Sequence, residues 1–98
     1  MIAETTVRAL AAARYSYMEV WHHAAPNGRH YVLGGPTRHA HVTLGGGAAG
    51  CATPEAAWAA AEVSLRREVA DAIARAKRER DRVDEEITRL TAALAGCL

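Results

Sequence analysis

The sequence is short of the large side chains from which a core is built. Its 98 residues include no Phe, and its aromatic residues are two Trp and three Tyr. Half of the residues are apolar, but alanine inflates that share, and alanine favours helix while burying little area. A chain of this length forms one domain. We therefore expect a thin core and a free energy of unfolding of only a few kcal/mol, unless a partner adds to it.

The sequence also has no large excess of positive or negative charge. Lys and Arg number 12, Asp and Glu number 11, and the formal net charge is +1. This balance provides no general attraction to nucleic acid or to an anionic membrane. No apolar run approaches the roughly 18 residues of a transmembrane helix, and the first residues lack the basic and apolar regions of a secretory signal. We expect a soluble, cytoplasmic protein with no membrane contact.

Cysteine is almost absent, with Cys51 and Cys97 as the two examples. Two cysteines do not make a disulfide framework. If one straight helix of about 40 residues separates them, the thiols lie roughly 60 Å apart at 1.5 Å per residue, too far for a disulfide bond. The sequence predicts two reduced thiols, as is usual in the cytosol.

Turn signals divide the first half of the chain. Asn27-Gly28 is the strongest short hairpin signal, a Gly-Gly-Pro-Thr break follows at 34–37, and three consecutive glycines begin at Gly45. Between these breaks lie β-branched and aromatic residues, which favour strands. Within a β-meander over residues 15–44 we expect strands near 15–24, 30–33 and 38–44, followed by a Gly-rich loop over 45–53.

Helix signals occupy both ends of the chain. Residues 1–14 are expected to form a short helix or an arm. Further on, Thr53 is an N-cap, Pro54 suits the first helical position and Glu55 suits the positive end of the helix dipole. No Gly or Pro then occurs before Gly96. The sequence thus predicts an α+β fold, a three-stranded antiparallel β-meander packed on one long C-terminal helix over 54–95.

The hairpin turn also predicts which side chains share a face of the sheet. A two-residue Asn27-Gly28 loop pairs Val32 with His23, and side chains alternate between faces along each strand. The face expected against the long helix carries Met18, Val20, Tyr31, Leu33, Ala40, Val42 and Leu44. The other face carries Tyr15, Tyr17, Glu19, Trp21, His23, His30, Val32, His39, His41 and Thr43. Aromatics and histidines in this number are typical of a binding surface, unless the N-terminal helix covers them.

The long helix carries a second apolar stripe near its end. Val83, Ile87, Leu90 and Leu94 follow at the spacing of a coiled-coil seam. A small sheet cannot also cover this stripe if the helix is straight. The stripe needs a partner, which is another copy of the chain, a different protein, or the same helix folded back at the charged stretch before it.

The histidines raise the alternative of a zinc site. His39 and His41 are two residues apart on a strand, and His23 and His30 lie beside them in the predicted register. Three or four imidazoles on one face can hold zinc with an open position for water. No HExxH or CxxC spacing is present, so we assign no metal ligand and keep a His-rich zinc-binding protein as an alternative.

No catalytic pattern stands out. Cys51 precedes a helix N-terminus, where a thiolate is stabilised, but a lone cysteine with a distant histidine is a weak pattern. The Gly-rich loop lacks the Gly-Lys-Ser/Thr ending of a phosphate loop. We predict a protein that is not an enzyme and needs no cofactor.

Basic residues crowd one stretch of the helix, which favours nucleic-acid binding when aromatics are also displayed. Acidic residues are interleaved with them, and a mixed-charge helix is usually a solvated face. A nucleic-acid-binding regulator is therefore a second alternative. It predicts a steep salt dependence of binding.

The order of elements resembles a group of small bacterial and phage modules. An aromatic strand, an Asn-Gly turn, two further strands and a Gly-rich loop precede Ala-Thr-Pro-Glu-Ala-Ala-Trp-Ala-Ala-Ala-Glu at 52–62. This succession, over about residues 15–75, is similar to HicB-like antitoxin domains, where a three-stranded sheet is backed by a helix. Small size, alanine-rich composition and lack of an enzymatic signature are similar to phage-encoded inhibitors of host defence, including anti-CRISPR proteins. The resemblance implies an inhibitor or antitoxin-like regulator.

We therefore hypothesise a non-enzymatic module that binds another protein or protein complex, as a phage or mobile-element inhibitor of host defence does. The alternatives are the antitoxin-like nucleic-acid-binding regulator and the zinc-binding protein. The predicted partner-binding residues are Tyr15, Tyr17, Trp21, His23, His30, His39, His41, Arg75, Lys77, Arg78, Arg80 and Arg82. The residues predicted to support a homodimer are Val83, Ile87, Leu90 and Leu94.

Overall fold

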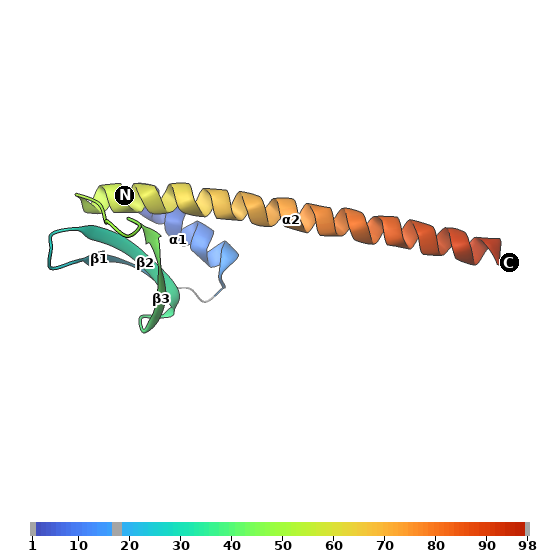
Figure 1. Cartoon of the computed structure of the whole chain (residues 1–98), viewed down its shortest axis with the longest axis horizontal. Coiled ribbons are helices and arrows are strands. Elements are labelled where there is room, and N and C mark those ends of the chain that lie inside the picture. Colours follow the sequence, from blue (N-terminus) through green and yellow to red (C-terminus); the bar gives the residue numbers. More distant parts are fainter. Residues whose placement is uncertain (1, 17–18, 98) are drawn as a thin grey trace.

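The computed structural model describes residues 2–16 and 19–97 and has the predicted α+β architecture (Figure 1). The sheet is antiparallel, with strand order β1-β2-β3. No helix in the described ranges combines the length and apolar character needed to cross a membrane. The elements are α1 (Ile2–Arg14), β1 (Glu19–Ala24), β2 (His30–Thr37), β3 (Ala40–Gly45) and α2 (Pro54–Gly96).

Helix α2 begins and ends close to the predicted positions. Thr53 is extended, and its Oγ1 accepts a hydrogen bond from the backbone N–H of Ala56 at 3.1 Å, which satisfies one of the free donors of the first turn. The 43 residues form one continuous helix, straight in Figure 1. At 1.5 Å per residue it spans about 64 Å, most of the 72 Å length of the molecule. The fold-back alternative is therefore wrong.

Both helices pack on the same face of the sheet, which we call the inner face. Arg8 joins the layers, because its guanidinium donates to the backbone carbonyl of Val20 at 2.7 Å and lies 5.3 Å from the ring centroid of Trp58. Helix α1 thus lies beside α2 and does not cover the opposite face. The core between the layers consists of Val7, Ala11, Val20, Val32, Leu44, Ala57, Trp58, Ala61 and Leu65.

The first hairpin departs from the predicted register. The pairs are Ala24 with His30 and His22 with Val32, one residue away from the expected pairing of Val32 with His23. The loop has three residues, not two: Gly28 donates to the carbonyl of Ala25 at 3.0 Å, and the positive φ of 80° is at Gly28 alone. Pro at the second position of the turn fixes a negative φ and favours a type I turn followed by a left-handed glycine.

The second hairpin also differs from expectation. The predicted loop at 34–37 is the second half of β2, and the turn lies at Arg38-His39, where Thr37 Oγ1 accepts from the N–H groups of His39 and Ala40, both at 3.3 Å. The register shifts between Gly34 and Thr37, as is common where Pro stands in a strand. The bounds predicted for the three strands, 15–24, 30–33 and 38–44, therefore differ from the observed bounds at several ends.

A shift of one residue moves a strand's side chains to the opposite face, so the predicted faces are partly wrong. Val32 is fully buried in the core rather than on the outside. Tyr31 and Leu33 pair with His23 and Trp21 and share their face, away from the helices. Met18 and Tyr17 lie outside the described residues.

The sheet approaches α2 closely at Gly45. A Cβ added there would meet the backbone of α2, at 2.7 Å from the N atom of Ala61 and closer still to the carbonyl oxygen of Ala57. A Cβ on Gly96 meets nothing within 4 Å.

We predict that Gly45→Ala lowers the free energy of unfolding by about 1–3 kcal/mol, since two backbones must move apart. Gly96→Ala is the matched control and should cause no loss, because alanine is the better helix former. Urea unfolding followed by circular dichroism measures both. Equal stability of the two variants would contradict the close approach.

Candidate binding surface

The open face of the sheet carries a cluster centred on Trp21. We define the outer face as Glu19, Trp21, His23, Leu33, Arg38, His41 and Thr43. Trp21, His23 and Leu33 face outward through the β1–β2 register, and Thr43 is the partner of Leu33 in β3. No described helix covers this face, because α1 and α2 both lie on the inner side (Figure 1).

Side chains from β3 and from the β2–β3 turn converge on the Trp21 indole of β1. The Arg38 guanidinium carbon lies 4.9 Å from its ring centroid, and the His41 ring meets it edge-on at 5.5 Å. Glu19 Oε2 lies 3.8 Å from Arg38 Nε, so a carboxylate stands beside the guanidinium that covers the indole. Arg38 and His41 are exposed and Trp21 is half-buried. Trp, Tyr and Arg are the residues enriched at the energetic centres of protein interfaces.

The histidines are divided between the two faces, contrary to prediction. His23 is exposed on the outer face, 6.3 Å from the Tyr31 ring, and His39 is exposed in the β2–β3 turn. His30 lies on the inner face, where its Nδ1 is 2.8 Å from Nε2 of His22. The predicted register placed His22 and His30 on opposite faces. A three-residue Pro-Asn-Gly loop places both on the inner face and would have predicted this pair. Among the described residues, no three His, Cys, Asp or Glu side chains lie close enough together to hold a metal ion.

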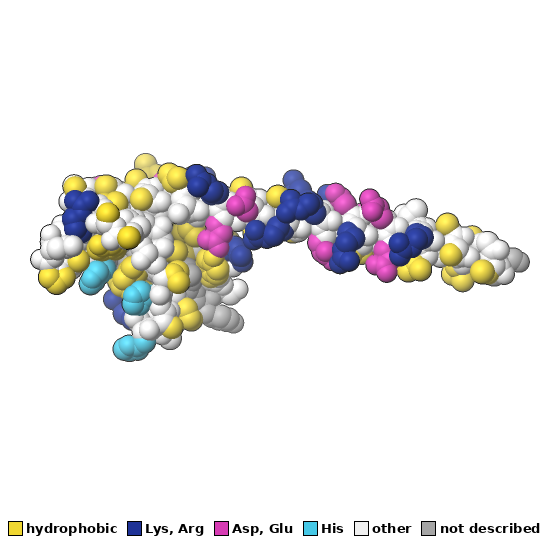
Figure 2. Space-filling view, viewed as in Figure 1, with side chains coloured by type: hydrophobic (Ala, Val, Ile, Leu, Met, Phe, Trp, Pro, Cys, Tyr) yellow, Lys and Arg dark blue, Asp and Glu magenta, His cyan; other side chains and the backbone are white. Residues whose placement is uncertain are grey.

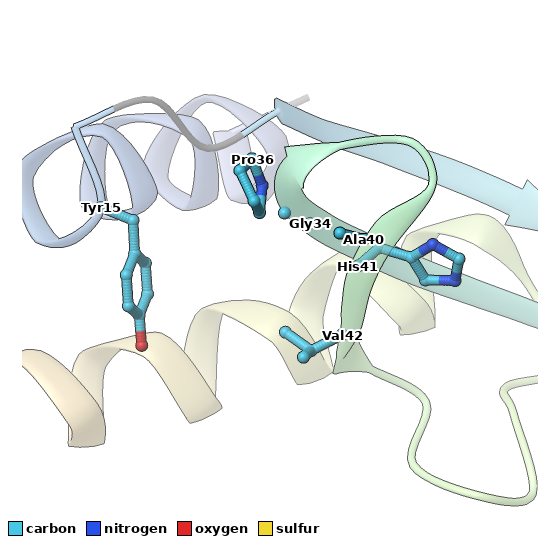
Figure 3. Close-up of a pocket in the computed structure, with 7 residues that line it drawn as sticks. Tyr15, Gly34, Pro36, Ala40, His41 and Val42 are labelled. Atoms are coloured by element: carbon cyan, nitrogen blue, oxygen red, sulfur yellow. The ribbon is translucent and has the colours of Figure 1, made fainter.

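Tyr15 is not on the outer face. It follows α1, beneath the Arg14 guanidinium at 4.9 Å. In Figure 3 it faces Val42 across a groove, while the His41 ring points away from both. The groove, of about 540 Å³, is lined by Tyr15, Gly34, Gly35, Pro36, Ala40, His41 and Val42.

The Gly-rich loop covers Tyr31. Gly46 and Gly50 have positive φ, and a Cβ on Gly50 would lie 2.8 Å from the Tyr31 ring. Arg29 fastens the loop by donating to the carbonyls of Ala49 at 3.2 Å and Gly50 at 2.9 Å. The loop is thus packed against the hairpin, and its glycines permit that contact.

The predicted charged residues all lie on the part of α2 that projects beyond the sheet, where basic and acidic side chains alternate (Figure 2). Arg82 donates to Glu79 at 3.1 Å, and this bond holds the pKa of the Glu79 carboxyl below its usual value. Arg80 and Asp81 are 3.4 Å apart. The neighbouring carboxylates offset part of the positive charge. The predicted basic residues of this stretch are Arg75, Lys77, Arg78, Arg80 and Arg82.

The structure therefore brings Trp21, His23 and His41 together on one face and adds Arg38, which sequence reasoning missed. It separates them from Tyr15 and His30 on the inner side and from the charged residues of α2. Tyr17 lies outside the described residues. No protein-family model, curated protein or solved structure gives a significant match to the chain.

We predict that Arg38→Ala exposes the Trp21 indole and lowers stability by about 0.5–1 kcal/mol, the range of an exposed cation–π contact. Acrylamide quenching of tryptophan fluorescence should increase, because acrylamide then reaches the Trp21 indole. The other tryptophan, Trp58, is only 4% exposed and contributes little to the change. Arg66→Ala, another exposed arginine paired with a glutamate at 3.0 Å, is the control. Unchanged quenching in Arg38→Ala would show that Arg38 does not cover Trp21.

Proposed function

We propose that the protein is a non-enzymatic binding module that contacts a partner protein through the outer face. The observation that supports this most directly is the Trp21 cluster, in which an indole, a guanidinium and an imidazole stand on an open sheet face. A half-buried indole held by its neighbours loses little conformational freedom on binding, which favours its use as an anchor. The exposed Arg38 guanidinium supplies hydrogen-bond donors beside the indole. The exposed His41 ring donates from Nδ1 to the Arg38 carbonyl at 3.0 Å, which leaves its Nε2 as a hydrogen-bond acceptor.

A protein partner fits this surface better than nucleic acid. The outer face has one arginine, and that arginine is already paired with Glu19. The basic residues of α2 are on another part of the molecule and are interleaved with carboxylates. Nucleic acid is bound by basic surfaces that neutralise several phosphates, and the outer face offers no such row of cations.

We further propose that the partner belongs to a larger bacterial complex and that binding inhibits it. The support for this finer proposal is the resemblance of residues 15–75 to HicB-like domains, together with the small size typical of phage-encoded inhibitors. An inhibitor of this kind acts by occupying a surface of its target. It therefore needs a complementary shape and anchoring side chains, and no catalytic residues.

We predict that Trp21→Ala weakens partner binding roughly 30-fold, the effect of losing an anchor worth about 2 kcal/mol. The tagged protein is used to capture partners from two halves of a bacterial lysate, one treated with nuclease and one untreated. The protein captured from the treated half is then purified for titration. Val63→Ala is the control, because Val63 is 62% exposed on α2, away from the outer face. Thermal unfolding verifies that both variants remain folded.

Two outcomes would contradict the proposal. Capture that is lost on nuclease treatment would assign the function to nucleic acid and to the basic residues of α2. Equal binding by Trp21→Ala and Val63→Ala would place the partner surface elsewhere on the molecule. Inhibition is tested separately, by adding the protein to the purified complex and measuring the complex's own activity.

A further inference from the structure

The projecting end of α2 carries a row of large apolar side chains. Val83, Ile87, Leu90 and Leu94 follow at spacings of four, three and four residues, the spacing of a coiled-coil seam. Their exposed fractions run from 41% to 68%, so no described residue covers them. We call these four residues the seam.

The seam lies on the side of α2 that packs on the rest of the molecule. Val83 follows Leu65, and Leu90 follows Ala72, by the same 18 residues, which is five turns of an α-helix. Leu65 is buried in the core, and Ala72 lines a groove of about 240 Å³ beside the end of α1. Because α2 is one continuous straight helix (Figure 1), the seam therefore points to the same side of α2 as α1 and the sheet, beyond the end of both.

This direction restricts how a second copy can pair along the seam. In a parallel pair, two α2 helices lie roughly 10 Å apart along their whole length. The side facing the partner is occupied by α1 and the sheet as far as Ile73 and Ala76, which border the groove beside Arg14. Each copy's α1 would then stand where the other copy's α2 must run. An antiparallel pair has no such collision, because it places α1 and the sheets at opposite ends.

The charges beside the seam favour the same orientation. A parallel pair brings Glu79 next to the partner's Asp84, at positions where opposite charges normally pair. In the antiparallel register that opposes Ile87 and the partner's Leu90, no like charges meet. Glu86 then flanks the partner's Ala93, and Asp84 flanks the partner's Thr91.

We propose that a second copy of this chain covers the seam as an antiparallel pair. Val83 packs on the partner's Leu94 and Ile87 on the partner's Leu90, each contact occurring twice by symmetry. The seam spans about two heptads, so the contact area is small and the dimer dissociates on dilution. This assembly does not depend on the function of the outer face.

Sedimentation of the full chain over a range of concentrations tests the pairing. The wild-type protein should pass from monomer to dimer, and Ile87→Asp should stay monomeric, because a carboxylate cannot be buried at the seam. Val63→Asp is the matched control on the opposite side of α2 and should still form dimers. A wild-type protein that is monomeric at every concentration, or Ile87→Asp dimers as stable as the wild type, would overturn the proposal.

Oxidative cross-linking tests the orientation. Arg80 and Cys97 each lie three residues beyond an end of the seam and are opposed in the antiparallel register. Mild oxidation of Arg80→Cys should give covalent dimers that disappear when Cys97→Ser is added. A parallel pair would place the two Cys97 thiols side by side. Covalent wild-type dimers linked through Cys97, or no cross-link in Arg80→Cys, would overturn the antiparallel arrangement.

Discussion

The contact between the first turns of α2 and the end of β3 determines the shape of the whole molecule. At Gly45 the sheet comes so near the helix that an added Cβ would clash with the backbone atoms of Ala57 and Ala61. Small residues on both sides allow this approach, and the larger Trp58 and Leu65 then close the core around it. Since α2 has no break after this contact, its direction there sets the path of all its later turns. The projecting segment, its charges and the seam are oriented by a contact at the other end of the helix.

The same contact explains how a chain with few large apolar residues can fold. Val7, Val32 and Leu65 are its largest fully buried side chains, and much of the remaining core is alanine. Alanine buries little area, but it lets α1, α2 and the sheet approach closely, so that dispersion contacts between main chains replace side-chain volume. Arg8 adds directional contacts, one to the carbonyl of Val20 and one to the Trp58 ring, which fix α1 against both the sheet and α2.

The α+β architecture and both ends of α2 could be predicted from the sequence, because Thr53-Pro54-Glu55 and Gly96 are local signals that act through backbone chemistry. The register of the first hairpin could not. Asn27-Gly28 favours a two-residue loop, yet Pro26 before it fixes a negative φ and favours a three-residue loop. That single residue moved Val32 into the core and separated His30 from His23. Arg38 was missed because the turn was placed at 34–37, before the residue that reaches Trp21.

The outer face and the seam are separated in a way that allows both to be used at once. The outer face is on the side of the sheet away from α2, whereas the seam lies on α2 beyond the sheet. Pairing along the seam in opposite directions leaves each outer face free and places the two at opposite ends of the assembly. Two such faces, held apart by a stiff helical rod, engage one partner together only if that partner presents two sites at the same separation. A repetitive or symmetric complex satisfies this condition, and binding by both faces then strengthens attachment without any new contact at either face.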